Sequence, residues 1–264
     1  NRTHPRIVVL GGGFGGLTFC QSFRSSRARV TLVDRQNHHL FQPLLYQVAA
    51  AGLAAPDIAQ PIRSILADHP NLNVLLDDVL DVRLPERVVI CERNELPYDF
   101  LILALGGRTS YFGHPEWEEF APGLKTLDDA LRIRRRILFA FEEAENTSDA
   151  RERERLMTIV VVGGGPTGVE LAGAFSELAR HVLKGEFRRI DPGQARVILI
   201  EGSPRLLGQF PPELGESARR QLNRLGVEVR TGTPVKNLAR RCVELAGETI
   251  HAENIIWAAG VSAS

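Results

Sequence analysis

Residues 7–17 read IVVLGGGFGGL, an apolar run that breaks into glycines around a single phenylalanine. Residues 159–169 read IVVVGGGPTGV, the same pattern shifted by 152 positions, with seven of eleven residues identical. Each apolar run is typical of a buried parallel strand, and residues with helical spacing follow each glycine cluster. The repeat predicts two copies of one strand–turn–helix unit in the 264-residue chain.

The first copy fits the dinucleotide fingerprint Gly-x-Gly-x-x-Gly at Gly11, Gly13 and Gly16. In this motif the first glycine permits a tight turn, the second lets the backbone approach a pyrophosphate, and the third lets helix and strand pack closely. The helix N-terminus then presents free N–H groups and partial positive charge to the phosphates. An acidic residue should end the second strand about 20 residues further on. Residues 28–34, ARVTLVD, supply that strand and end at Asp34.

The second copy has Gly163, Gly165 and Gly168 in the same spacing. Its second strand, ARVILIE, ends at Glu201, after a polar excursion, KGEFRRIDPGQ, that lengthens the connection. A carboxylate there favours a ribose 2′-hydroxyl over a 2′-phosphate, which predicts NADH rather than NADPH. Arg205, nearby in sequence, weakens this preference without reversing it. Two complete fingerprints predict two bound dinucleotides and electron transfer between them.

Composition limits the alternatives. The length suits two domains at about 150 residues each, and Lys plus Arg equals Asp plus Glu at 32 each, so nothing favours nucleic acid as a partner. The three cysteines are far apart in sequence and form no CxxC pair, which predicts neither a zinc site nor a dithiol centre. No apolar run reaches the roughly 18 residues of a membrane span, so we expect a soluble chain.

A second, fainter repeat supports the two-domain interpretation. YDFLILALGG (98–107) and ENIIWAAG (253–260) each predict a buried strand that ends in small residues, offset by 154 positions from Gly106 to Gly260. Small residues at these ends would let the chain pass close to a cofactor. Two strands that end in ordinary turns are the simpler alternative.

Between the first fingerprint unit and residues 98–107, the sequence resembles the type II NADH dehydrogenases, single-chain flavin NADH:quinone oxidoreductases. The resemblance is carried by Asn37, His38, Phe41 and the run PLLYQVA at 43–49, and it extends to RTSYFGHPEW (108–117), LDDALRIRRRILFAFEEAE (127–145) and GGGPTGVELAGAFSEL (163–178). It covers essentially the whole chain and is more specific than either glycine fingerprint.

The resemblance implies that FAD binds the first fingerprint, NADH binds the second, and a hydride passes to flavin N5 before two electrons reach a membrane quinone. The FAD residues would be Gly11, Gly12, Gly13, Phe14, Gly15, Gly16, Asp34, Arg35, Pro43, Leu44, Val79, Ala104 and Gly106. The NADH residues would be Gly163, Gly165, Pro166, Thr167, Gly168, Glu170, Glu201, Ala259 and Gly260. The chemistry belongs to the cofactor, and the protein supplies placement and electrostatics.

Several of these assignments have a structural alternative. Residues 43–49 would run beneath the flavin ring, or they form an amphipathic helix with Leu44, Leu45 and Val48 in a core. Glu170 lies near the nicotinamide by resemblance, or it is an acid favoured by the helix dipole. The backbone of Val79 would contact adenine.

Other polar clusters favour structural roles. His38 and His39 have no partners that would complete a metal site, so we predict no metal and expect surface or capping roles. RIRRR (132–136) belongs to a helix that opens with a capping box from Thr126 to Asp129. Its apolar residues recur at three- and four-residue steps and predict one apolar face, and we expect the arginines to form a solvated face. The apolar residues are Leu127, Leu131, Ile133, Ile137, Leu138 and Phe141.

The sequence departs from the family pattern at two places. Leu105 stands where the family has threonine before a glycine, which removes one polar contact. The chain also stops at Ser264, where relatives continue with a segment that returns to the flavin domain and supplies the quinone pocket and membrane helices. We therefore expect a shortened chain.

The predicted fold is α/β, with two Rossmann-like domains that each combine a parallel sheet, flanking helices and a small antiparallel meander. Residues 1–120 would bind FAD and residues 121–264 NADH. The predicted location is the cytoplasm, peripheral on the inner face of the cell membrane in the full-length protein, and the oligomeric state stays open, a homodimer included. Two other functions stay open: an NAD(H)-binding remnant without turnover, and a disulfide reductase, for which Cys20 alone is insufficient.

Overall fold

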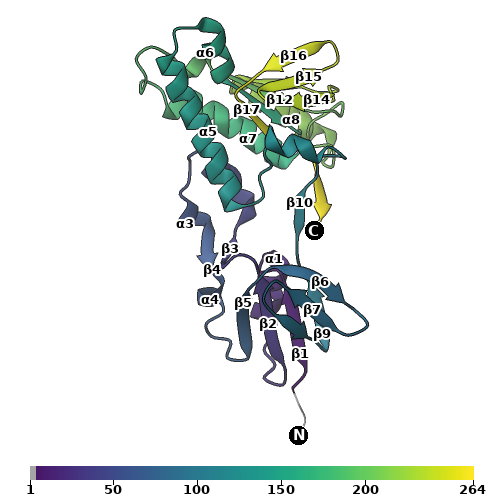
Figure 1. Cartoon of the computed structure of the whole chain (residues 1–264). Coiled ribbons are helices and arrows are strands. Elements are labelled where there is room, and N and C mark those ends of the chain that lie inside the picture. The colour runs from purple at the N-terminus through teal and green to yellow at the C-terminus, as the bar shows by residue number, and fades with distance from the viewer. Residues whose placement is uncertain (1–3) are drawn as a thin grey trace. The chain divides into compact units, whose positions relative to one another are not determined.

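The computed structural model describes residues 4–264, which form two compact units (Figure 1). The first unit comprises residues 4–41, Pro56–Arg108 and Ala263–Ser264, and the second comprises Gln42–Ala55 and Thr109–Ser262. Each unit has a parallel sheet with helices on one face and a small antiparallel meander on the other. The predicted fold class is confirmed.

The grouping by contacts differs from the predicted boundary near residue 120. Residues 42–55 and 109–120 group with the second unit. Residues 42–55 do so because the short helix α2 (Leu45–Ala49) packs against α5 (Leu127–Asn146) and α7 (Pro166–Glu177) of that unit. The assignment of FAD and NADH to the two parts of the chain stays a prediction.

The sheet of the first unit has the strand order β5-β2-β1-β9, and all its pairs are parallel. Ile7 pairs with Val30 on one side of β1, and Leu10 pairs with Leu103 on the other. The strands are β1 (Arg6–Leu10), β2 (Arg29–Asp34), β5 (Leu72–Leu76) and β9 (Phe100–Leu103).

Alternation along these strands builds two cores in the first unit. Val9 and Leu32 face the helix side, where α1 and α4 supply Leu17, Cys20 and Ile62. The other face carries Leu10 and Val33 against the meander residues Val89 and Cys91. The remaining elements are α1 (Phe14–Ser22), the ribbon β3 (His38–Leu40) with β4 (Ala59–Pro61), α3 (Ala55–Ile58), α4 (Ile62–Ile65), and the meander β6 (Val79–Arg83), β7 (Val88–Cys91) and β8 (Glu95–Pro97).

The second unit repeats this plan in the order β13-β12-β11-β17, again parallel. Ile159 pairs with Val197, and Val162 pairs with Trp257. These pairs correspond to Ile7 with Val30 and Leu10 with Leu103 in the first unit. The strands are β11 (Thr158–Val162), β12 (Arg196–Ile200), β13 (Val227–Arg230) and β17 (Asn254–Trp257).

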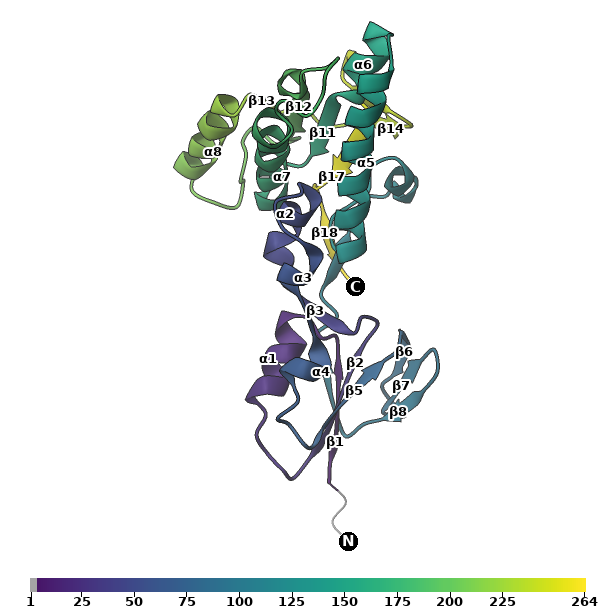
Figure 2. The same ribbon diagram turned by 90° about the vertical axis from the view of Figure 1, so that its left-hand side faces the viewer.

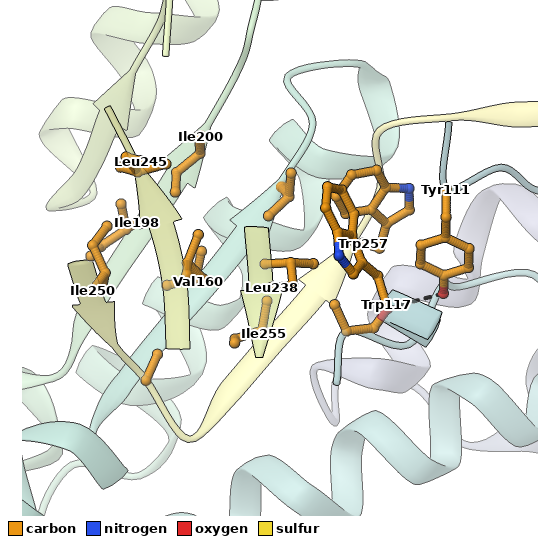
Figure 3. Packing of buried hydrophobic residues seen from close by; sticks show 14 residues of the cluster. Tyr111, Trp117, Val160, Ile198, Ile200, Leu238, Leu245, Ile250, Ile255 and Trp257 are labelled. Carbon is orange, nitrogen blue, oxygen red and sulfur yellow. Dashed lines mark hydrogen bonds between the residues drawn. The ribbon is translucent and has the colours of Figure 1, made fainter. Parts of the chain in front are cut away.

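Helix α7 (Pro166–Glu177) covers one face of this sheet, beside α8 (Pro212–Arg224) (Figure 2). Figure 3 shows the opposite face, where Val160 and Ile198 lie beside side chains of the meander. Trp257, in the same cluster, lies beside Tyr111 and Trp117. The meander consists of β14 (Asn237–Ala239), β15 (Cys242–Leu245) and β16 (Glu248–His251).

Helix α5 (Leu127–Asn146) confirms the predicted capping box. The Thr126 hydroxyl accepts from the Asp129 N–H at 3.1 Å, and the Asp129 carboxylate accepts from the Thr126 N–H at 2.9 Å. Leu131, predicted on its apolar face, is instead 40% exposed, because the buried face of this helix runs through alanines such as Ala130 and Ala140.

The other elements are short. They are η1 (Gln42–Leu44), β10 (Gly107–Thr109), η2 (Pro115–Glu119), α6 (Ala150–Leu156), η3 (Leu178–Val182), η4 (Pro192–Gln194) and β18 (Val261–Ala263). The chain passes between the units after residues 41, 55, 108 and 262, the last two in β10 and β18. Over residues 4–264, no helix combines the length and the apolar character that a bilayer crossing requires.

Candidate dinucleotide-binding sites

The first glycine of each fingerprint is required by backbone geometry. Gly11 has φ +101° and Gly163 has φ +115°, a region that L side chains rarely adopt. A Cβ on Gly11 would also collide with the carbonyl of Ala104, and one on Gly163 would lie 2.6 Å from the carbonyl carbon of Ala258. These two turns therefore need glycine for both conformation and space.

Two further positions are glycine because protein atoms fill the space. A Cβ on Gly12 would lie 2.6 Å from the terminal methyl of Ile62, and one on Gly164 would lie 2.6 Å from a methyl of Leu206. The third fingerprint glycines, Gly16 and Gly168, would each strike the carbonyl oxygen of the first glycine.

The second fingerprint glycines, Gly13 and Gly165, are different. Apart from the adjoining backbone of its own chain segment, no atom of residues 4–264 lies within 4 Å of a Cβ built on either residue. Each is the N-cap of its helix, α1 or α7, and neither helix has a side-chain cap. An open space beside an uncapped helix N-terminus is where a pyrophosphate would bind. The open space beside Gly13 and Gly165 therefore fits the phosphates of FAD and NADH.

The two acids make the same pair of hydrogen bonds in the two units. Asp34 accepts from the Gly12 N–H at 2.5 Å with one oxygen and from the Gln36 N–H at 2.7 Å with the other. Glu201 accepts from the Gly164 N–H at 2.6 Å and from the Ser203 N–H at 2.6 Å. Each carboxylate is thus fixed beside its glycine loop, with lone pairs left for ribose hydroxyls.

The remaining first-unit candidates lie in several settings. Phe14 and Arg35 are exposed, Gly15 lies beside Ala104, and Val79 begins β6 immediately before a register shift. The Ala104 N–H donates to the Leu10 carbonyl, and Gly106 has φ +71°. The structure thus brings Ala104 to the turn at Gly11.

Pro43 and Leu44 belong to the second unit, in η1, whereas the other predicted FAD residues belong to the first. Pro43 is exposed and Leu44 is half-buried. Leu45 and Val48 of α2 are buried, as the amphipathic alternative predicts. Pro43 is accessible to a ligand, and its predicted contact with the flavin stays a prediction.

The second-unit candidates gather around the start of α7. Pro166 is its first residue, and Thr167 beside it is exposed. The turn at Gly163 lies against Ala259, whose Cα would be 2.6 Å from an added Cβ. The carbonyl of Gly260 accepts from the Ser110 N–H at 3.1 Å, so the end of β17 is fixed there.

Glu170 lies beyond the first turn of α7, and its side chain is exposed with no partner among the described residues. Partial burial of its carboxyl raises its pKa above the ordinary value. A helix dipole would act in the opposite direction and weakens beyond the first turn. Both interpretations of Glu170 stay predictions.

The cysteines do not form a redox pair. Burial raises the pKa of Cys20, inside α1, to about 11. The pKa values of Cys91 and Cys242 are also raised, mainly by burial and to a smaller extent by nearby acidic side chains. A catalytic cysteine needs a lowered pKa and access. These environments disfavour the disulfide reductase alternative.

Three functional neighbours of the glycine loops were not predicted. Ile62 and Leu206 pack behind the middle glycines. His39 Nδ1 lies 3.0 Å from the carbonyl oxygen of Gly12, and His38 bonds instead to Asn37. The sequence offers no signal that separates these two adjacent histidines.

Comparison with known proteins agrees with this geometry. The family model of the pyridine nucleotide-disulphide oxidoreductases matches residues 5–264. The chain is 44% identical to the type II NADH:quinone oxidoreductase Ndh of Mycobacterium tuberculosis, over 98% of this chain and 58% of that protein. It is 31% identical to a probable NADH dehydrogenase of Dictyostelium discoideum, over 98% of this chain and 59% of that protein.

A solved structure, NDH2 from Plasmodium falciparum in complex with NADH, superposes with a TM-score of 0.93 at 26% identity, covering 99% of this chain and 56% of that one. This chain thus spans just under three fifths of the length of these two curated relatives. The resemblance to type II NADH dehydrogenases is confirmed. Two fingerprints, two acids and a family match over nearly the whole chain lead to one conclusion: the chain belongs to the pyridine nucleotide-disulphide oxidoreductase family.

Proposed function

We propose that this chain is the two-nucleotide portion of a flavin-dependent NADH:quinone oxidoreductase. The observation that carries the proposal is the duplicated cradle, in which Gly13 and Gly165 each face open space at an uncapped helix N-terminus. The names of the relatives point to the same activity. When bound, FAD would accept a hydride from NADH and pass two electrons to a quinone.

Apart from Glu170, the residues of the chain would bind and orient the two coenzymes. The fixed carboxylate of Asp34 would hold the FAD ribose, and the N–H groups at the start of α1 would hold its pyrophosphate. Glu201 and α7 would do the same for NADH. Glu170, an exposed carboxyl with a raised pKa, is the candidate catalytic residue beside the nicotinamide.

The second cradle favours NADH over NADPH. The Glu201 carboxylate would repel a 2′-phosphate. Arg205, the nearby cation, donates instead to the Gly208 carbonyl at 2.8 Å and is thereby held by its own loop. Another cation of this region, Arg230, is paired with Glu228 and Glu248.

The test is anaerobic addition of NADH to the protein after incubation with FAD and removal of free flavin. We expect the visible flavin absorbance to bleach, to return when a soluble quinone is added, and to respond far less to NADPH. A colourless protein that binds NADH would support the NAD(H)-binding remnant and contradict the proposal. Equal response to NADPH would overturn the role of Glu201.

The proposed acceptor has a consequence for location. A quinone resides in lipid, so we propose that the whole protein acts at the inner face of the cell membrane, as the family resemblance implies, through segments outside this chain. Sedimentation of the full-length protein with lipid vesicles would test the membrane contact. Light scattering would show whether the protein is a homodimer.

A further inference from the structure

We propose that His39 is a positioning residue that aims the Gly13 N–H at the FAD pyrophosphate. The inference rests on the proposed binding of FAD to the first fingerprint. It starts from the bond between His39 Nδ1 and the carbonyl oxygen of Gly12, at 3.0 Å. A carbonyl cannot donate, so Nδ1 carries the proton and donates.

The Gly12 carbonyl and the Gly13 N–H belong to one planar trans peptide. They therefore point in opposite directions, and fixing the carbonyl also fixes the N–H. The N–H of Gly12 itself is held by Asp34. Gly13 is the position where a Cβ would meet only open space, so its N–H direction determines what a ligand there encounters.

The second unit makes the same bond with a different donor. The carbonyl of Gly164, which corresponds to Gly12, accepts from the backbone N–H of Leu207 at 2.8 Å. Leu207 adopts φ +51°, an uncommon conformation for a residue with a side chain. In both units the donor comes from the segment after the second-strand acid, as the His39 side chain five residues after Asp34 and as the Leu207 backbone six residues after Glu201. The same carbonyl is thus held in both loops, by a side chain in one and by the backbone in the other.

Packing fixes the His39 ring in place. Its residue pairs with Gln60 in the β3–β4 ribbon, which fixes the backbone. Phe14 meets the ring edge-on, with centroids 5.2 Å apart and planes at 89°, and Phe41 contacts Phe14 in turn. The ribbon continues into Ile62, which packs behind Gly12. One short element therefore supports the loop from two sides.

The test compares His39→Leu with His39→Asn, because an Asn amide places a donor near the position of Nδ1. A neutral hydrogen bond contributes about 0.5–1.5 kcal/mol, which corresponds to about 2- to 12-fold in affinity. We expect His39→Leu to weaken FAD binding by about that factor and His39→Asn to restore it. NADH binding should be unchanged in both variants, because Leu207 holds the second loop.

Amide hydrogen exchange provides a readout that needs no cofactor. We expect His39→Leu to accelerate exchange in residues 11–16 and to leave residues 163–168 unchanged. Unchanged exchange in both segments, or an Asn variant as weak as the Leu variant, would overturn the inference. One result would separate the two proposals. If the wild-type protein binds no FAD but exchange at residues 11–16 is still faster in His39→Leu, the proposed function is wrong, whereas His39 does hold the Gly12–Gly13 peptide in place.

Discussion

At the scale of single residues, each glycine of the two loops has its own physical reason. Gly11 has a backbone conformation that favours glycine, and a side chain on Gly16 would collide with a carbonyl oxygen. Gly13 borders open space in which a ligand could approach the backbone. The fingerprint spacing was sufficient to predict these roles from sequence, because each depends on local geometry. His39 and Ile62 could not be predicted, because their contacts with Gly12 come from a separate segment with no local pattern.

Glu170 gives a pH-dependent prediction. Partial burial raises its pKa above the ordinary value of 4.5, so ionisation of the folded protein is disfavoured and stability falls as pH rises through the raised pKa. Because glutamine has no charge, we expect Glu170→Gln to melt at a higher temperature than wild type at pH 7.5. The difference should disappear toward pH 4, where both side chains are neutral.

Thermal melts of the two proteins at both pH values measure this effect. Glu177→Gln, which removes an exposed carboxylate from the same helix, is the matched control. A variant that is less stable than wild type at pH 7.5 would show that the Glu170 charge stabilises the fold. The desolvation argument would then be wrong.

At the scale of elements, the best predictions were those with local signals. The capping box fixed the start of α5 correctly, and the two strand–turn–helix units lie where the repeat predicted them. The exposed side of α5 was less well predicted, since Leu131 is exposed while the alanines are buried. A helix face that packs closely through alanines cannot be recognised from the spacing of the large apolar residues.

The polar excursion after α7 contacts α5 through the Phe187 ring, whose centroid lies 6.2 Å from that of Phe141, and its backbone is held by one carboxylate of α5. Glu145 accepts the N–H groups of Arg188, Arg189 and Ile190 at 2.9–3.1 Å. Burial opposes ionisation of this carboxyl, but the three N–H donors outweigh it and lower its pKa. The anchor is therefore present above the ordinary pKa of the carboxyl and is lost as pH falls through the lowered pKa.

We expect Glu145→Gln to loosen this excursion. Trypsin should cleave after Arg188 or Arg189 faster than in wild type at neutral pH, because an amide accepts fewer hydrogen bonds and carries no charge. Glu143→Gln, on the same helix, is the control, since the Glu143 carboxylate is exposed and makes no hydrogen bond or ion pair with residues 4–264. Equal cleavage rates in all three proteins would show that the loop is held by other contacts.

At the scale of the whole molecule, the second unit repeats the first down to single hydrogen bonds. The first glycine N–H donates to the end of the second strand in both, Gly11 to Val33 and Gly163 to Ile200. The sequence predicted this duplication from its two glycine clusters. It could not predict that residues 42–55 would group with the second unit, because that depends on packing between distant helices.

The central claim is that the chain holds two dinucleotides in separate cradles, FAD at Gly13 and NADH at Gly165. The most direct measurement is calorimetric titration of both coenzymes into wild type, Gly13→Ala and Gly165→Ala. The added methyl meets no protein atom in either variant, so we expect folding to be retained and the approach of a pyrophosphate to be blocked. Wild type should bind one FAD and one NADH without competition, Gly13→Ala should lose FAD alone, and Gly165→Ala should lose NADH alone. Competition between the coenzymes, or loss of both in either folded variant, would contradict the account.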